Sequence, residues 1–361
     1  MAILPPHVLR VLACASCGGR VGAEASSVCC RDCGRRFPVS GGIPNLRREL
    51  DARAEAVREF YSVAPFPGYP PRDSYPALRV RAGRSEFARL LDRAIAPDAT
   101  VLEVGCGTGQ MSLFLATGDR LVIGADLTRA SLELAAAAAR RFGIERVRFV
   151  ETDLRNPGLR AGAFDVVYCS GVLHHTPDPR ASFRAIARLV RPGGFIVVGV
   201  YNAYARIPHR LRRAIARLTG FRWTPLDPVL RDRAAEPARR AAWLQDQYRH
   251  PEEHRHTLAE IQAWLEEGGA EYLRTYPSTI IGEPPLDGGG LFAPAEDDWA
   301  FENVLQQLSW SWTLGREGGL FAVIGQLRSG SSSPGKRSTS CGACSWRSPP
   351  SLRARRGSSS G

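Results

Sequence analysis

Between residues 100 and 201, short apolar runs alternate with segments whose apolar residues recur at helical spacing. The apolar runs predict strands at 101–104, 121–125, 147–151, 165–169 and 195–201. The periodic segments predict helices at 110–116, 128–142 and 179–190. Strands that alternate with helices form mostly parallel sheets, because a parallel strand pair needs a crossover connection. The pattern therefore predicts an α/β fold with a doubly wound, mostly parallel sheet.

The alternation stops after residue 201 and returns at residue 257. Residues 202–256 carry twelve arginines against six acidic residues, and we expect a helical cap insertion there. A helix at 257–267 and strands at 271–276 and 320–326 then complete a Rossmann-like sheet of seven strands, with a second insertion at 277–319. The expected domains are 1–46, a cysteine-rich module; 47–98, a helical and proline-rich connector; 99–201, the core; 202–256, the cap; 257–327, the completed sheet; and 328–361, a basic tail.

Polar and small residues support the predicted helix ends. Thr128 can cap its helix, Gly143 can end it, and Asp178 followed by Pro179 is a typical helix start. Residues 191–194, Arg-Pro-Gly-Gly, are expected to turn into the next strand. An amphipathic helix is also predicted at 85–96, ahead of the core.

The first strand of the core runs into three alternating glycines, Gly105, Gly107 and Gly109, before the next helix begins. Such a turn lets the backbone approach a ligand closely and presents unpaired N–H groups. Gln110 stands where the dinucleotide fingerprint would have its last glycine. With Glu103 ahead of it, the turn resembles the first motif of the class I methyltransferases that use S-adenosylmethionine (SAM).

Four further positions or segments extend this resemblance over residues 99–201. Asp126 follows the second strand and Asp153 the third, while 164–179 and 189–199 resemble the fourth and sixth motifs of the same superfamily. The resemblance is strongest to the small-molecule branch that includes the ubiquinone-type methyltransferases. It implies that SAM is bound by Glu103, Gly105, Gly107, Gly109, Asp126, Leu127, Asp153, Leu154 and Ser170. A helix cap remains the alternative for Asp126, and a loop cap for Asp153.

The sulfonium of SAM already activates the methyl group, so a methyltransferase mainly aligns its acceptor and excludes water. A base is needed only where the acceptor carries a proton, and His174 or His175, after the fourth strand, are the catalytic candidates. The alternative is that one of them packs beneath its loop. Acceptor contacts are expected from Tyr201, Asn202, Tyr248 and His250. The histidine-rich segment 246–256 could also bind a metal or be a solvated loop.

The first 46 residues contain two C-x-x-C pairs, Cys14 with Cys17 and Cys30 with Cys33. Two such turns complete a closed tetrahedral zinc site, which is structural because no open position remains. Cys29 could compete with Cys30, and a disulfide or free thiols are the alternative to zinc. With the residues that follow, the module resembles the zinc-ribbon activator subunits of RNA and release-factor methyltransferases, which implies a folding or docking role.

The connector at 62–77 is rich in proline and aromatic residues. One interpretation is a stiff linker that packs its aromatic rings on the core. The other is a strap over the mouth of the cofactor or acceptor site. The sequence leaves both open.

The formal net charge of +12 is concentrated in the tail, where 328–361 holds six arginines and Lys336 without an acid. About +5 remains for the rest of the chain, so charge is a weak indication of a nucleic-acid partner. The tail is expected to be disordered, with a basic binding arm as the alternative and little weight for Cys341 and Cys344. No membrane span or signal peptide is predicted, and we expect a cytoplasmic location.

These observations predict a SAM-dependent methyltransferase that moves a methyl group to an O, N or C atom of a small-molecule, glycan or lipid-like acceptor. An RNA methyltransferase is the enzymatic alternative, because the module and the cap are rich in arginine. A SAM-binding scaffold that recruits a partner is the non-enzymatic alternative. The sequence does not indicate an oligomeric state.

Overall fold

We describe the fold from a computed structural model of the chain. It describes residues 4–63, 69, 73–221, 227, 230, 243–244, 247–248, 252–287, 289–295, 300–314 and 318–329. All of these residues belong to one compact unit, Met1–Ser329. His250, most of residues 222–251 in the cap insertion and nearly all of the tail therefore lie outside the described residues.

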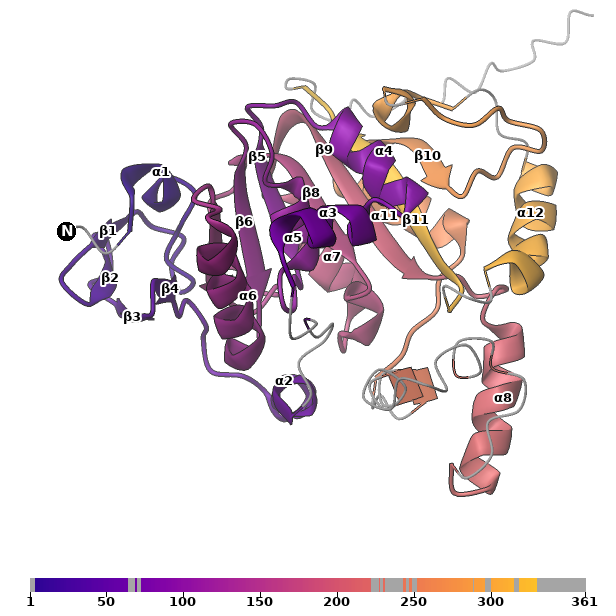
Figure 1. Ribbon diagram of the computed structural model, residues 1–361, viewed down its shortest axis with the longest axis horizontal. Coiled ribbons are helices and arrows are strands. Elements are labelled where there is room, and N and C mark those ends of the chain that lie inside the picture. Colours follow the sequence, from indigo (N-terminus) through magenta and orange to yellow (C-terminus); the bar gives the residue numbers. More distant parts are fainter. Residues whose placement is uncertain are drawn as a thin grey trace, which may run out of the picture. The chain divides into compact units, whose positions relative to one another are not determined.

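A seven-stranded sheet forms the centre of the molecule (Figure 1), with the strand order β10-β11-β9-β8-β5-β6-β7. Its strands are β5 (Thr100–Val104), β6 (Leu121–Asp126), β7 (Val147–Glu151), β8 (Phe164–Ser170), β9 (Val190–Tyr201), β10 (Ala270–Tyr276) and β11 (Leu320–Leu327). The pairs among β5, β6, β7, β8 and β9 are parallel, whereas β11 runs antiparallel to both neighbours. The predicted mostly parallel seven-stranded sheet is confirmed.

Helices cover both faces of this sheet because each strand is apolar on both sides. Successive residues of β5 point to opposite faces, so Val101 belongs to one apolar cluster and Leu102 to the other. One cluster includes α3 (Tyr75–Ala82), α4 (Glu86–Ala94), α5 (Gln110–Leu115) and α6 (Arg129–Phe142). The other includes α7 (Pro179–Ala187) and α11 (Leu258–Glu267). The doubly wound arrangement follows from this division.

The helix ends agree with most of the predicted signals. Asp178 accepts a capping hydrogen bond from the Ala181 N–H, and Gly143 ends α6 with φ 68°. Thr128 occupies the N-cap position of α6, but its side chain makes no capping bond. The predicted turn at residues 191–194 is instead part of β9, where the register against β8 shifts between Phe164 and Val166.

The N-terminal module, residues 4–46, contains α1 (Pro6–Leu9) and an antiparallel sheet of β1 (Val21–Ala23), β2 (Ser27–Cys30), β3 (Arg36–Ser40) and β4 (Ile43–Pro44). It joins the central sheet at the edge strand β7, on the side of the molecule where β6 and α6 lie in Figure 1. Asn45 forms a parallel bridge with Glu151, and the Leu46 N–H donates to the Glu151 carbonyl at 2.8 Å. The Arg129 guanidinium also donates to the carbonyls of Ser40 and Ile43. Backbone and side-chain bonds thus hold the module against the core.

The remaining described elements lie in the connector and the insertions. They are α2 (Ala52–Val63) before the core, the 3₁₀ turn η1 (Leu173–His175) after β8, α8 (Ile207–Leu218) after β9, and η2 (Gly290–Phe292) and α12 (Ala300–Thr313) between β10 and β11. Among the described residues, no helix combines the length and apolar composition that a membrane crossing requires.

Candidate active site

A cavity of about 630 Å³ lies at the carboxyl ends of the parallel strands. This is where open α/β sheets bind ligands, at the point where the strand order reverses. Its floor is formed by residues at strand ends and in the loops after them, namely Glu103, Gly105, Gly107, Asp126, Leu127, Asp153, Leu154 and Ser170. The cavity thus brings together the predicted cofactor-binding residues from four loops, with only Gly109 outside its lining.

The glycine turn after β5 leaves no space for a side chain at Gly105 or Gly109. Gly105 has φ 70°, and a Cβ there would lie 2.2 Å from a methyl carbon of Val172. Gly109, the N-cap of α5, has φ 75°, and its Cβ would lie 2.8 Å from that of Ala135. Both positions therefore require glycine for conformation and for packing. The turn can expose its backbone to the cavity only because these side chains are missing.

Asp126 connects the glycine turn to the start of α6. One carboxylate oxygen accepts from the Gly107 N–H at 2.8 Å, and the other accepts from the Thr128 N–H at 2.8 Å. The second bond closes a turn at Thr128, the N-cap residue of α6, and is not the helix cap that the sequence offered as the alternative, because a cap accepts from N–H groups inside the first helical turn. Burial raises the pKa of this carboxyl above its usual range. Asp126 also lines the cavity, so its two backbone hydrogen bonds are compatible with ligand binding.

Glu103 is the second carboxyl group at the floor of the cavity. It is buried and accepts a hydrogen bond from the Ser112 hydroxyl of α5. Burial raises the pKa of Glu103 to about 7, and the nearby Asp126 charge adds to this shift. A positively charged ligand group beside Glu103 would favour its ionised form.

Asp153 is held by Arg155. The Arg155 side chain donates to both carboxylate oxygens, with its shortest bond at 2.7 Å, and the Arg155 N–H donates to one of them at 2.9 Å. This is the loop cap that the sequence allowed as an alternative. The same guanidinium also contacts Asp51, next to α2. Asp153 still lines the cavity, and its predicted binding role stays a prediction.

His175 borders the cavity opposite the glycine turn. Its Nδ1 lies 2.8 Å from the Glu252 carbonyl oxygen, which can only accept. In the neutral ring Nδ1 therefore carries the proton and Nε2 is the acceptor. Burial lowers the pKa of His175 to about 4, so the ring is neutral at physiological pH.

His174 is not among the residues that line the cavity. It is fully buried, and its ring centroid lies 3.9 Å from that of Tyr201. This is the packing role that the sequence allowed for one histidine of the pair. The geometry therefore favours His175 over His174 as a group that could act on a ligand.

Tyr201, Trp243, Gln247 and Leu320 form the wall beyond His175. The Gln247 side-chain amide donates to the Tyr201 hydroxyl at 2.6 Å, and the Arg206 guanidinium carbon lies 3.8 Å from the centre of the Tyr201 ring. Arg206 is completely buried and donates to Gln247 at 2.6 Å and to Glu253 at 2.8 Å. This network fixes Tyr201 at the end of β9.

The other predicted acceptor residues have structural partners. The Asn202 side chain accepts from the Tyr204 and Ala205 N–H groups and donates to Gln307 at 3.0 Å. Tyr248 is fully buried and donates to Asp227 at 2.6 Å. Neither residue lines the cavity, so an acceptor contact for them stays a prediction.

The connector contributes to the wall of the cavity. The sequence left open whether the connector packs on the core or covers the site. Ala54, Val57 and Tyr61 of α2 line the cavity, and the Tyr69 hydroxyl donates to the Thr108 carbonyl in the glycine turn at 2.5 Å. The Tyr69 ring also packs 6.4 Å from that of Phe142, as the linker interpretation expects. Sequence reasoning missed α2 as a lining element, although its helical spacing of 54, 57 and 61 was visible.

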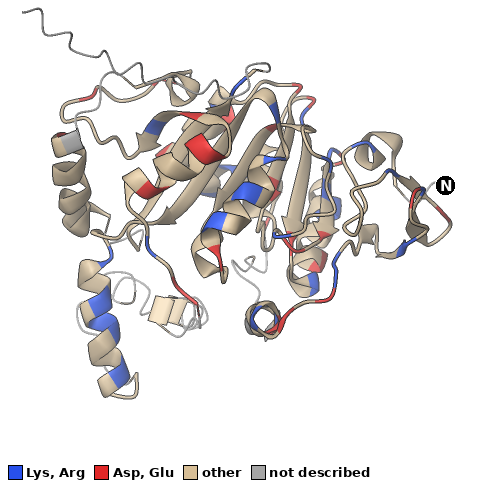
Figure 2. Ribbon diagram, turned by 180° about the vertical axis from the view of Figure 1, so that it is seen from behind, with Lys and Arg blue, Asp and Glu red and all other residues tan. Residues whose placement is uncertain are grey.

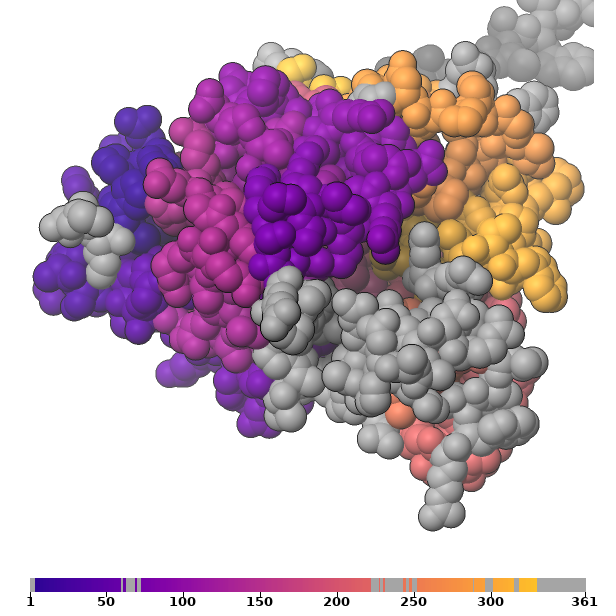
Figure 3. All heavy atoms as spheres, viewed as in Figure 1, coloured from indigo at the N-terminus to yellow at the C-terminus, as the bar shows by residue number. Residues whose placement is uncertain are grey.

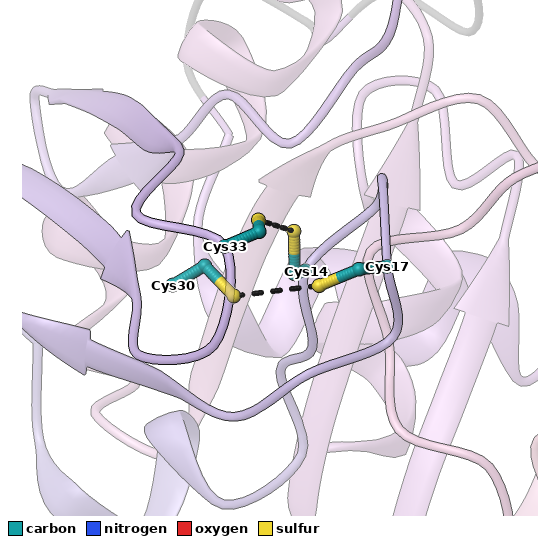
Figure 4. Close-up of side chains that lie close together, drawn as sticks. All are labelled: Cys14, Cys17, Cys30 and Cys33. Atoms are coloured by element: carbon teal, nitrogen blue, oxygen red, sulfur yellow. Dashed lines mark hydrogen bonds between the residues drawn. The ribbon is translucent and has the colours of Figure 1, made fainter.

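The four paired cysteines of the N-terminal module point toward one another (Figure 4). Their sulfur atoms all lie within 4.8 Å, with 3.7 Å between Cys14 and Cys33 and 3.5 Å between Cys17 and Cys30. Tetrahedral zinc with Zn–S bonds of about 2.3 Å requires sulfur separations near ~3.8 Å. Cys29 points to backbone carbonyls instead. The donor set therefore fits a closed metal site, and Cys30 is its member. Among the described residues, no second cluster suited to a metal is present.

Comparison with known proteins agrees with this geometry. A family model described as a methyltransferase domain matches residues 102–198, from within β5 to within β9. The ubiquinone biosynthesis O-methyltransferase of Cronobacter sakazakii is 38% identical over 106 residues, covering 29% of this chain and 44% of that protein. Residues 102–198 form a class I SAM-dependent methyltransferase domain.

More distant matches extend beyond this methyltransferase domain. An uncharacterized protein of Synechococcus is 28% identical over 265 residues, covering 66% of this chain and 62% of its own length. The chain thus spans about half of the length of these two curated relatives. The magnesium protoporphyrin IX methyltransferase of Synechocystis superposes with a TM-score of 0.45 at 16% identity, covering 76% of this chain and 99% of that one.

The raised pKa of Glu103 predicts a pH-dependent effect of Glu103→Gln on stability. The pKa of Glu103 rises from 4.5 in the unfolded chain to about 7 in the folded chain. The contribution of Glu103 to the free energy of unfolding is therefore highest below pH 4.5 and is lost as the pH rises through 7. Glu103→Gln cannot ionise and therefore avoids this loss. The unfolding free energy of the variant minus that of the natural chain should be larger by roughly 2 kcal/mol at pH 8 than at pH 5. Urea unfolding without ligand measures the difference. The exposed Glu145→Gln should show none, and equal effects of Glu103→Gln at both pH values would contradict the prediction.

Proposed function

We propose that this chain is a SAM-dependent methyltransferase that acts on a small, largely apolar acceptor, within the predicted class of small-molecule, glycan or lipid-like acceptors. The carrying observation is one cavity that runs from the glycine turn and Asp126 to His175 and Tyr201. A cofactor bound at the first group would reach toward an acceptor at the second. No membrane span or nucleic-acid element is needed for this reaction.

The residues at the floor of the cavity fit the parts of SAM. Asp126 offers a carboxylate that could accept from ribose hydroxyls, and Glu103 offers one suited to the ammonium group. Gly105, Gly107 and Gly109 allow the backbone to approach, while Leu127, Asp153, Leu154 and Ser170 complete the expected set. When bound, SAM supplies an activated methyl group. The chain itself must position the acceptor and keep water out.

We infer that His175 takes a proton from the acceptor. The Glu252 carbonyl holds the proton on Nδ1, which leaves Nε2 as the basic nitrogen. The low pKa keeps this nitrogen available across physiological pH. A base of low pKa is weak, and it suits an acceptor whose proton becomes acidic as the methyl group is transferred.

The composition of the wall supports a small apolar acceptor over RNA. Val57, Pro177, Ile186, Trp243 and Leu320 are apolar contributors. The two described arginines of the lining are both paired, Arg81 with Asp73 at 2.7 Å and Arg155 with Asp153 at 2.7 Å. Phosphate groups are bound by free basic side chains, which this part of the wall does not offer.

We also propose that Cys14, Cys17, Cys30 and Cys33 hold a structural zinc ion. Four thiolates leave no open position, so the metal would stabilise the N-terminal module without taking part in methyl transfer. The module in turn packs on β7 and on the loop that follows it.

Isothermal titration with SAM tests the cofactor site. We expect saturable binding, and Asp126→Ala should weaken it at least about tenfold because a charged hydrogen-bond acceptor is lost. The exposed Asp119→Ala serves as the matched control and should bind as the natural chain does. Absence of binding at millimolar SAM would refute the proposed activity.

Replacement of His175 by Asn separates catalysis from cofactor binding. The Asn amide can still donate to the Glu252 carbonyl but provides no basic nitrogen. The acceptor is found by incubating the protein with labelled SAM and cell extract. The extract is then separated into small molecules, lipids and ribonuclease-sensitive RNA, and the labelled fraction contains the acceptor. With the labelled fraction, His175→Asn should lower the rate by about 10²- to 10⁴-fold and leave SAM affinity within about twofold.

The pH profile checks the same assignment. The rate of the natural enzyme should be nearly constant above pH 5 and fall as the pH drops through about 4, because Nε2 then becomes protonated. An unchanged rate in His175→Asn would exclude the base. Label found only in ribonuclease-sensitive material would overturn the proposed acceptor class, and SAM binding without transfer into any fraction would favour a scaffold.

Metal analysis of the purified chain should give one zinc ion per molecule. Cys17→Ser should lose most of it because a tetrahedral site needs all four thiolates. Cys29→Ser, the matched control, should retain one zinc because its sulfur points away from the cluster. A natural chain without metal, or equal loss in both variants, would contradict the assignment.

A further inference from the structure

Helix α8 exposes an apolar strip that the fold does not cover. Ile207 is 51% exposed, Leu211 65% and Leu218 88%, and Ala214 between them is exposed as well. These four residues recur at helical spacing and form what we call the α8 face. The opposite side of the helix carries the buried residues His209 and Ala216. Helix α8 is therefore anchored on one side and apolar toward solvent on the other.

Two arginines accompany the α8 face. Arg210 and Arg217 are exposed, and neither forms an ion pair within the described part of the chain. The other two arginines of the helix, Arg212 and Arg213, lie toward Asp227 and Glu253. No acidic residue occurs in α8, as the blue segments in Figure 2 show. The exposed side of α8 is thus both apolar and positively charged.

A second exposed apolar strip lies on α12, at the same end of the molecule (Figures 1 and 2). It contains Phe301, Val304, Leu305, Leu308 and Trp312, of which Phe301 is 75% and Trp312 84% exposed. Gln307 of α12 bonds to Asn202, just before α8, so the two helices share an attachment to the core. Helix α12 forms part of the outer surface in Figure 3.

We propose that this end of the protein docks on an anionic lipid bilayer, with the α8 face in the headgroup region. A helix of this kind, apolar on one side with flanking arginines, lies in the plane of a membrane interface. The apolar residues supply burial, while Arg210 and Arg217 attract anionic headgroups. An exposed Trp and Phe on α12 suit the same interface. Such docking requires no helix that crosses the bilayer.

The charges favour a lipid surface over a second copy of the chain. A two-fold contact would place the α8 faces of two molecules together, with Arg210 and Arg217 of both in one interface. Helix α8 offers no acidic residue to neutralise them, and like charges in an interface are unfavourable. An anionic bilayer supplies the missing counter-charge.

Sedimentation with lipid vesicles tests this docking and needs neither cofactor nor acceptor. The full chain should sediment with vesicles of phosphatidylcholine and phosphatidylglycerol at low salt, and much less with phosphatidylcholine alone. Arg210→Gln combined with Arg217→Gln should weaken binding about tenfold or more, because each arginine near the surface contributes about fivefold. Leu211→Ser combined with Leu218→Ser should weaken it similarly. Arg184→Gln combined with Arg188→Gln, exposed positions at α7, is the matched control and should change little.

All substituted residues are exposed, so the variants should fold, and circular dichroism together with SAM titration verifies this. The proposal is overturned if the natural chain ignores anionic vesicles, if it binds neutral vesicles equally well, or if the α8 variants bind as the control does. Light scattering provides a further outcome. If the natural chain forms a dimer and does not bind vesicles, and if Leu211→Ser combined with Leu218→Ser dissociates that dimer, the α8 face is a contact between two copies.

Discussion

The site depends on the hydrogen bond between the Gly107 N–H and the Asp126 carboxylate. This 2.8 Å contact joins the turn after β5 to the end of β6, two neighbouring strands whose carboxyl ends open onto the same cavity. It restrains the glycine turn, in which Gly105 and Gly109 have left-handed backbone angles. The same carboxylate bonds to the start of α6. One half-buried acid thereby sets the relative positions of a turn, a strand and a helix around the ligand space.

Buried charge performs a related task on the opposite wall. Arg206 is removed from water, and its two terminal nitrogens donate to Glu253, Gln247 and the Gly318 carbonyl while the guanidinium covers the Tyr201 ring. An arginine so buried is costly unless paired, and loss of either partner would leave a charge in the interior. The network therefore couples three distant segments of the chain. Its geometric result is a fixed Tyr201 beside His175.

Much of the core could be predicted from the sequence because its signals are local. Apolar runs located the strands, and the requirement for glycine at Gly105 and Gly109 is encoded in the turn itself. The spacing of Cys14, Cys17, Cys30 and Cys33 likewise identified a closed cluster that the sulfur distances fit. The contacts of α2 and of Gln247 with the cavity were not predictable, because they arise where the connector and the cap insertion fold over the sheet. The two histidines differ only through tertiary packing, since adjacent residues of η1 face Tyr201 and the cavity respectively.

The N-terminal module solves a problem of the sheet and thereby reaches the site. An edge strand leaves unpaired backbone groups, and β7 is such an edge until Asn45 and Leu46 pair with Glu151. The loop that follows β7 carries Asp153, and Arg155 within it contacts Asp51, which follows the module. The loop is thus restrained by its strand, by its own ion pair and by the chain that leaves the cysteine cluster. Because Asp153 faces the cavity from this loop, the order of the ligand-binding surface depends on a module that contributes no residue to it.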